Sequence, residues 1–262
     1  GYVAGHYGYD DVHIDLSRLA QFAGARFLRA DVIGLERADR RVLLRDRPAL
    51  RYDLLSINIG STPQVDAVPG AQTHAVAVKP IFRFNQRWLA LLARMQDHDG
   101  PAMIAVVGGG AGGVELTLAM QYRLRTALRE RGHDPDALVF HLFTADAVLL
   151  PTHNTAVQRR FAAALRSRGV QVHYDAAVTE VREGRLRTRA GQWFEADEIV
   201  WVTQAGGAAW LQDTGLALDD RGFIRVNDAL QSVSDPLVFA SGDVASMDHH
   251  RLEKAGVFAV RM

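Results

Sequence analysis

The chain has 262 residues, of which 48% are hydrophobic and 23% charged, a composition typical of a globular protein large enough for two modest α/β cores. Thirty basic residues balance thirty acidic ones, which argues against nucleic acid as a partner, and the lack of cysteine excludes disulfides and thiolate chemistry within the chain. Neither a signal-peptide pattern nor an apolar run of about 20 residues occurs, so a cytoplasmic location is the default expectation.

The first hundred residues alternate between short helical and strand-like patterns. Apolar residues recur at helical spacing over residues 11–24, which predicts a helix stopped by its last glycine. Runs at 26–35, 41–45 and 52–59 are rich in leucine and β-branched residues, and we interpret them as a β-meander that ends in a buried strand. Residues 84–95 again show helical spacing, within a crossover that ends at Gly100 and Pro101.

The next segment has the pattern of a doubly wound nucleotide-binding domain. Residues 103–107 are a fully apolar run suited to a central parallel strand, and a glycine-rich stretch follows at once. Beyond it we predict a helix that reaches Gly132, and then strand, helix, strand, meander and strand, at residues 138–143, 155–168, 170–172, 178–188 and 198–202. Residues 222–226 and 236–243 are strand-like once more, without a second glycine-rich turn between strand and helix.

The glycine-rich stretch has the spacing of a dinucleotide fingerprint. The first glycine of such a motif permits a tight turn, the second lets a pyrophosphate approach the backbone, and the third lets the helix pack closely on the strand. The phosphates then lie at a helix N-terminus, where free N–H groups and the helix dipole favour negative charge. The residues expected to hold the coenzyme are Gly108, Gly109, Gly110, Ala111, Gly112 and Gly113.

The sequence leaves the choice between NADH and NADPH open. Domains that bind NAD usually have an acidic residue at the end of the second strand. In this chain Thr144 occupies that position, and Asp146 follows two residues later. Thr144 is a candidate hydrogen-bond partner of a ribose. Arg159 or Arg160 could meet a 2′-phosphate, although a solvated helix face is the preferred explanation of both arginines.

Three motifs, in order, resemble those of the pyridine nucleotide-disulfide oxidoreductases with two dinucleotide-binding domains, in particular the type II NADH dehydrogenase-like branch. Residues 52–63 are similar to the strand before the family's Ala-Thr-Gly-x-x-Pro turn. Residues 108–115 resemble its NAD fingerprint with the following Val-Glu, and residues 236–243 its second FAD motif. The resemblance implies an FAD-dependent NAD(P)H oxidoreductase, with FAD and NAD(P)H as cofactors and a small-molecule, non-disulfide electron acceptor.

The resemblance also implies roles for individual residues. Glu115 would lie near the nicotinamide, although an acidic residue early in a helix also favours the dipole without any such role. Asp243 would bind the flavin ribityl chain, Gly60 would lie beside the FAD, and Val32 would meet the adenine through its backbone. A helix that starts at Lys254 would direct its N–H groups at the flavin. The adjacent His249 and His250 have no further ligand cluster, so no metal site is predicted.

The chain departs from the family pattern at several points. Asn58-Ile59 replaces Ala-Thr before Gly60, and Met262 stands where quinone reductases of this type usually have glutamine. The first strand, the FAD fingerprint and the first helix of the family would precede Gly1, so we expect a fragment. The opening segment and residues 254–261 resemble a subgroup often fused to selenide, water dikinase, which makes that enzyme an expected fused or neighbouring partner; a homodimer is left open.

The expected fold is α/β, with a Rossmann-like NAD(P)-binding domain inserted in an incomplete, three-layer FAD/NAD(P)-binding domain. Residues 1–75 would be the first part of the FAD-binding domain, 76–100 the crossover, 101–215 the NAD(P)-binding domain and 216–262 the return segment. The sequence also allows a second hypothesis, in which the chain is not an enzyme. In that alternative the chain is a nucleotide-binding regulatory or docking module without turnover, associated with selenophosphate synthesis.

Overall fold

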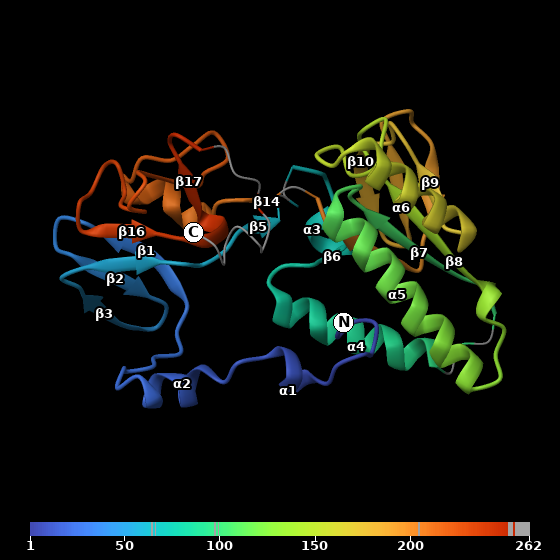
Figure 1. Ribbon diagram of the computed structural model, residues 1–262, viewed down its shortest axis with the longest axis horizontal. Coiled ribbons are helices and arrows are strands. Elements are labelled where there is room, and N and C mark those ends of the chain that lie inside the picture. The colour runs from blue at the N-terminus through green and yellow to red at the C-terminus, as the bar shows by residue number, and fades with distance from the viewer. Residues whose placement is uncertain are drawn as a thin grey trace. The chain divides into compact units, whose positions relative to one another are not determined.

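A computed structural model describes residues 1–63, 65, 67–96, 98, 100–203, 205–250 and 254. The chain forms two compact units (Figure 1). The middle unit comprises Gly1–His13 and Pro63–Gln204, and the flanking unit comprises Ile14–Thr62 and Ala205–Met262. Short strands β5 (Thr62–Pro63) and β14 (Ala205–Gly206), which pair with each other, lie where the chain passes from one unit to the other. Among the described residues, no helix combines the length and the apolar character needed to cross a membrane.

The middle unit is built on a five-stranded parallel sheet with the strand order β6-β13-β7-β8-β9. Its strands are β6 (Val76–Ala77), β7 (Ala102–Val107), β8 (Leu138–Phe143), β9 (Gln171–His173) and β13 (Glu198–Trp201). The central position of β7 explains its apolar sequence, because both faces of the sheet are covered there and the side chains of the strand are shielded from water. The predicted α/β architecture is confirmed.

Three long helices cover one face of this sheet: α4 (Ile81–Gln96), α5 (Ala111–Glu130) and α6 (Thr155–Ser167), with the 3₁₀ turn η1 (Pro135–Ala137) after α5. Side chains of successive strand residues point to opposite faces, so Phe140 and Leu142 of β8 pack in the core that holds Trp88 of α4, Leu124 of α5 and Leu165 of α6. All three helices were predicted, and their bounds lie within a few residues of the expected ones.

The opposite face of the sheet carries a three-stranded antiparallel meander and the short helix α3 (Ala71–His74). The meander consists of β10 (Val178–Arg182), β11 (Arg185–Thr188) and β12 (Trp193–Glu195). Its Leu186 packs with Phe143 and Trp201 of the parallel sheet. The sequence predicted a smaller meander without β12. The unit therefore has helices on one face and mostly strands on the other.

The predicted helix over residues 11–24 is wrong as a single element. Two short helices occur instead, α1 (Tyr9–Val12) and α2 (Leu16–Phe22). His13 between them has extended backbone angles, and the Asp15 carboxylate accepts hydrogen bonds from the amides of Ser17 and Arg18 and so starts a new helix. The break coincides with the change from one unit to the other.

The flanking unit combines an antiparallel sheet with two parallel strand pairs. The sheet contains β1 (Val32–Glu36), β2 (Arg41–Leu44) and β3 (Arg47–Arg51), whereas β4 (Leu55–Ile57) pairs with β16 (Val238–Ala240) and β15 (Ile224–Val226) with β17 (Ala245–Met247). The 3₁₀ helices η2 (Ala209–Thr214) and η3 (Gly242–Val244) complete it. Residues 26–31 are not a strand, β3 and β17 were not predicted, and β4 lies outside the meander.

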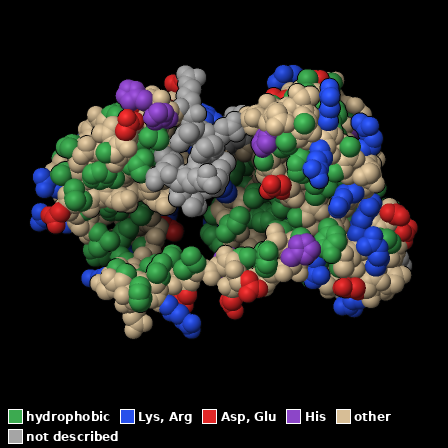
Figure 2. All heavy atoms as spheres, viewed as in Figure 1, with side chains coloured by type: hydrophobic (Ala, Val, Ile, Leu, Met, Phe, Trp, Pro, Cys, Tyr) green, Lys and Arg blue, Asp and Glu red, His purple; other side chains and the backbone are tan. Residues whose placement is uncertain are grey.

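Helix α2 exposes its apolar side chains. Leu16, Leu19 and Phe22 are 55%, 49% and 90% exposed, and no residue of α2 is buried. Hydrophobic side chains accordingly appear at the surface over α2 (Figure 2). The helical spacing detected in the sequence is real, but within the described chain this apolar face covers no core.

A pair of histidines, one buried and one partly buried, joins β8 to β9 in the middle unit. His141 Nδ1 and His173 Nε2 lie 2.8 Å apart, and the His173 ring stacks on Phe143 at 4.4 Å between ring centres. His141 is 6% exposed, and its Nε2 has no hydrogen-bond partner in the described part of the chain. Burial lowers the pKa of both imidazoles, and at His141 the neighbouring His173 lowers the pKa further.

This pair predicts that acid weakens the protein. Because the folded-state pKa of each histidine is below the value of about 6.5 expected in the unfolded chain, the unfolded state takes up protons first as the pH falls. The contribution of the two neutral histidines to the free energy of unfolding is complete above about pH 6.5 and is lost as the pH falls below this value. The melting temperature should therefore decrease as the pH is lowered from about 7.5 to about 5.5. In the double variant His141→Phe/His173→Phe the decrease should be smaller. The exposed His153→Ala should match the unmodified protein; equal slopes for all three would contradict the prediction.

Candidate functional site

The glycine turn lies between β7 and α5, at the carboxyl end of the central strand. Gly108 has φ of 132°, and a Cβ there would stand 2.5 Å from the carbonyl oxygen of Val202. A Cβ at Gly113 would stand 1.8 Å from the carbonyl oxygen of Gly108. Both contacts involve backbone atoms that cannot swing aside. The close packing expected at the first and third glycines of the motif is therefore present, and only glycine fits at these two positions.

The second glycine of the motif, Gly110, faces open space. A Cβ at Gly110 would meet no atom within 4 Å, although the residue is the N-cap of α5 and has an ordinary extended backbone with φ of −75°. The helix has no side-chain cap, and the amide N–H groups of Ala111, Gly112 and Gly113 donate no hydrogen bond to the residues that the structure describes. Free amides at a helix N-terminus beside an uncrowded backbone fit a pyrophosphate.

The loop after β8 braces this turn. A Cβ at Gly109 would stand 2.3 Å from Thr144 Oγ1, and the amide of Leu150 donates to the Gly109 carbonyl at 2.9 Å. Thr144 is only 1% exposed, and its hydroxyl oxygen accepts a hydrogen bond from the amide of Asp146 at 3.2 Å. The structure thus places Thr144 against Gly109, with its side chain directed into the loop.

The charged candidates of the middle unit are all exposed. Glu115 lies on α5 two residues after Gly113. Arg159 and Arg160 lie on α6, and Asp146 follows Thr144 in the loop after β8. None of the four takes part in an ion pair within the described chain. These groups therefore remain accessible to a ligand.

A second polar site lies in the flanking unit, where β4 and β16 run side by side. The turn after β4 contains Gly60, with φ of 71°, and η3 after β16 contains Asp243. Ser61 Oγ donates to Asp243 Oδ2 at 3.1 Å, so two motifs far apart in the sequence meet at the carboxyl ends of parallel strands. Ser61 was not among the predicted site residues, although a hydroxyl directly after the glycine of a turn was the available signal.

Lys254 lies near Asp243 in the same unit. Its ammonium donates to the carbonyl of Ala245 and lies 4.3 Å from the centre of the Phe223 ring. Burial lowers the pKa of Lys254, while the carboxylates of Asp219 and Asp243 act in the opposite direction. The predicted helix beyond Lys254 and the position of Met262 lie outside the described residues. Val32 begins β1, where it pairs with Leu44 of β2.

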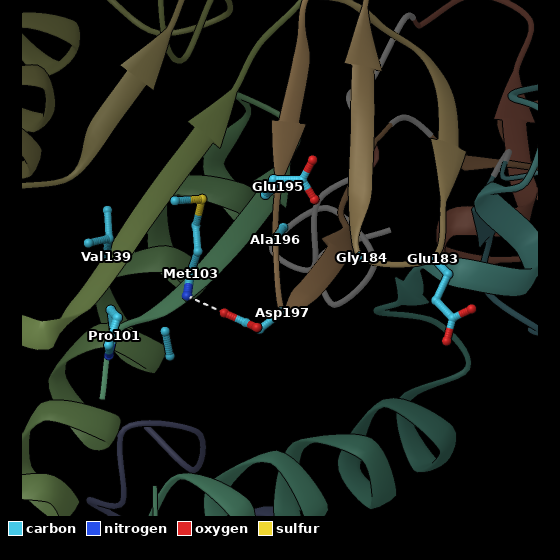
Figure 3. A pocket seen from close by; sticks show the side chains of 9 residues that line it. Pro101, Met103, Val139, Glu183, Gly184, Glu195, Ala196 and Asp197 are labelled. Atoms are coloured by element: carbon cyan, nitrogen blue, oxygen red, sulfur yellow. Dashed lines mark hydrogen bonds between the residues drawn. The ribbon is translucent and has the colours of Figure 1, made fainter. Parts of the chain in front are cut away.

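A separate cavity of about 600 Å³ lies at the opposite edge of the parallel sheet, near the amino ends of β7 and β8 (Figure 3). Its lining includes Met103, Val139, Glu183, Glu195 and Asp197. Asp197 is already engaged, since its Oδ2 accepts the amide hydrogen of Met103 at 2.7 Å. Because ligands of parallel α/β sheets bind beyond the carboxyl ends of the strands, this cavity is not the nucleotide site.

The parallel sheet, the meander on its second face and the glycine turn at the start of α5 define a Rossmann-type fold of the FAD/NAD(P)-binding class. The chain belongs to the pyridine nucleotide-disulphide oxidoreductase family, whose model matches residues 14–258. The resemblance inferred from the three sequence motifs is thereby confirmed.

The chain is similar to two longer bacterial proteins over most of its own length. The chain is 28% identical over 242 residues to the type II NADH:quinone oxidoreductase of Haemophilus influenzae, an alignment that covers 83% of this chain and 53% of the relative. It is 27% identical over 250 residues to the NADH dehydrogenase-like protein Rv1812c of Mycobacterium tuberculosis, covering 88% and 58%. The chain thus spans little more than half the length of these relatives.

Solved structures show the same fold. The water-forming NADH oxidase of Lactobacillus brevis, bound to NADH, superposes with a TM-score of 0.79 at 21% identity and covers 99% of this chain and 57% of that one. NDH2 of Plasmodium falciparum in complex with NADH gives a TM-score of 0.70 at 16% identity, covering 84% and 50%. These likenesses establish the fold.

Proposed function

We propose that the protein carrying this chain is an FAD-dependent NAD(P)H oxidoreductase of the NADH dehydrogenase-like type. The observation that carries the proposal is the α5 N-terminus, where free amides face the open space beside Gly110. When both cofactors are bound, the nicotinamide supplies a hydride and the flavin accepts it. The protein supplies binding, orientation and fixed dipoles.

The middle unit would hold the coenzyme by its backbone. The amides of Ala111, Gly112 and Gly113 would donate hydrogen bonds to the pyrophosphate, and the α5 dipole would add to the attraction. The close contact between Gly109 and the Thr144 side chain would hold the glycine turn in the conformation that pyrophosphate binding requires. Glu115, exposed just beyond the turn, is proposed to lie near the nicotinamide.

The flanking unit would hold the flavin. Asp243 offers carboxylate oxygens to the hydroxyls of a ribityl chain, and its hydrogen bond from Ser61 keeps the carboxylate in position. Gly60 leaves its side of the turn without a side chain, which suits close approach of a cofactor. Lys254, whose partly buried ammonium lies near Asp243, and Val32 at the start of β1 are proposed as further flavin contacts.

The acceptor of the electrons is proposed to be a small molecule. The names of the relatives point to quinones: the Haemophilus influenzae relative is an NADH:quinone oxidoreductase, and a Synechocystis relative is a demethylphylloquinone reductase. The present chain has no cysteine, so its own side chains offer no disulfide relay. A homodimer and a fused or neighbouring selenide, water dikinase stay predictions from the sequence.

The proposal is tested by flavin content and by bleaching. We expect the purified protein to bind FAD and the flavin absorbance to fall when NADH is added without oxygen. Asp243→Ala should weaken FAD binding at least tenfold, about 1.4 kcal/mol, because the ribityl hydroxyls lose their acceptor. Asp228→Ala, which removes an exposed carboxylate of the same unit, is the matched control.

Two outcomes would contradict the proposal. One is a flavin-containing protein that neither NADH nor NADPH bleaches. The other is an Asp243→Ala variant that binds FAD as tightly as the Asp228→Ala control. A colourless protein with measurable NADH affinity would support the regulatory or docking module instead.

A further inference from the structure

The residue that usually recognises the coenzyme ribose is not available in this chain. In Rossmann folds the adenosine ribose lies near the end of the second strand, where a carboxylate accepts hydrogen bonds from its hydroxyls. Here that position is Thr144, whose side chain is 1% exposed, packs under Gly109 and accepts the Asp146 amide hydrogen. Recognition of the ribose must therefore come from another residue at this edge of the sheet.

Asp146 and Asp175 are placed to take this role. Asp146 follows β8 and Asp175 follows β9, its neighbour in the sheet, and both are exposed. The amide of Asp175 donates to the Asp146 carbonyl at 3.1 Å, and the amide of Ala176 donates to the Thr144 carbonyl at 2.8 Å. Asp175 adopts φ of 51°, a conformation that this turn imposes. Backbone hydrogen bonds thus hold the two carboxylate-bearing loops together.

Neither carboxylate is neutralised. Within the described chain, no ion pair or side-chain hydrogen bond engages the carboxylate of Asp146 or Asp175. The hydroxyls of an NADH ribose donate hydrogen bonds and would be stabilised there. The 2′-phosphate of NADPH carries a charge of about −1.5 to −2 and would be repelled by both groups.

Arg159 and Arg160 are the competing candidates, because a guanidinium would attract the 2′-phosphate. They lie in the second turn of α6, beyond the loop that follows β8, whereas Asp146 lies three residues after the end of β8. No described contact directs either arginine toward the glycine turn. The short distance along the chain from β8, together with the backbone hydrogen bonds between the two loops, favours the carboxylates over the arginines.

We propose that Asp146, supported by Asp175, makes this site select NADH over NADPH. The inference rests on the proposed function, because it presupposes that the glycine turn binds a nicotinamide coenzyme. Asp146 is a specificity residue that touches the ribose and takes no part in the chemistry.

The dissociation constants of NADH and NADPH, measured by calorimetric titration of the full chain, test the proposal. We expect at least tenfold tighter binding of NADH. In the double variant Asp146→Asn/Asp175→Asn this preference should shrink at least tenfold, mainly through tighter NADPH binding. Glu130→Gln, which removes an exposed carboxylate at the far end of α5, should leave the ratio unchanged.

The possible failures are distinguishable. A ratio unchanged by the double aspartate variant would overturn the inference while leaving the proposed function intact. A native preference for NADPH that Arg159→Ala/Arg160→Ala removes would assign selection to the arginines instead. Failure of both coenzymes to bind would overturn the proposed function itself and this inference with it.

Discussion

The variant Gly110→Ala is expected to bind NADH at least tenfold more weakly than the unmodified protein while its melting temperature stays the same. A methyl group at residue 110 meets no protein atom within 4 Å, and the extended backbone there suits alanine as well as glycine. The methyl group would instead occupy the space through which a pyrophosphate approaches the α5 amides. A tenfold loss corresponds to about 1.4 kcal/mol of binding free energy. Fluorescence titration and a thermal melt measure the two quantities on one sample.

Gly8→Ala is the matched control for this variant. Gly8 is also the N-cap of a helix in the middle unit, with a similar extended backbone at φ of −74°. A Cβ there would lie 3.3 Å from Asp11 Oδ2, the end of an exposed side chain that can move. Gly8→Ala should keep full NADH affinity. If Gly110→Ala bound NADH equally well, the open space at Gly110 would not be the pyrophosphate site.

Gly113→Ala is expected to have the opposite profile, a large loss of stability. The added Cβ would stand 1.8 Å from the carbonyl oxygen of Gly108, a backbone atom held in place between β7 and α5. The helix would have to move away from the strand, and overpacking of this kind costs about 1–3 kcal/mol or more. A melting temperature several degrees lower, at about 2–4 °C per kcal/mol for a chain of this size, is the expected result. Urea unfolding gives an independent value.

The same substitution three residues earlier, Gly110→Ala, serves as the control. Both variants add one methyl group to the same turn, but at Gly110 the methyl group meets no protein atom, whereas at Gly113 it meets the Gly108 carbonyl. If Gly113→Ala were as stable as Gly110→Ala, the close contact between the helix and the turn would be contradicted.

The strands and helices around the glycine turn could be predicted because their sequence signals are local and strong. The apolar run of β7 and the glycines after it indicate a buried strand that enters a helix, and the structure has both. Short elements of the sheets were harder to predict. β3, β12 and β17 have only three to five residues each and acquire their strand geometry from their neighbours.

The helix predicted over residues 11–24 shows a different limit. Its apolar spacing continues through a segment where His13 is extended and Asp15 starts a new helix. A capping residue in the middle of a periodic pattern was the signal against one helix. Periodicity alone does not detect such a break, because the apolar spacing of α2 is a true helical pattern.

The candidate site was predictable where one motif suffices, as in the glycine turn. It was not predictable where residues from separate loops meet. The hydrogen bond between Ser61 and Asp243 depends on the pairing of β4 with β16, and the contact between Asp146 and Asp175 depends on the pairing of β8 with β9. The burial of Thr144 under Gly109 likewise requires the folded loop.

The most direct test of the central claim is an NMR titration of the protein labelled with ¹⁵N at glycine. The amides of the glycine turn are assigned by comparison with the Gly110→Ala variant and its neighbours. If the α5 amides bind a pyrophosphate, NADH and ADP alike will shift the signals of Gly109, Gly110, Gly112 and Gly113 more than those of distant glycines such as Gly34. Saturating coenzyme that leaves these four amides unshifted would contradict the account.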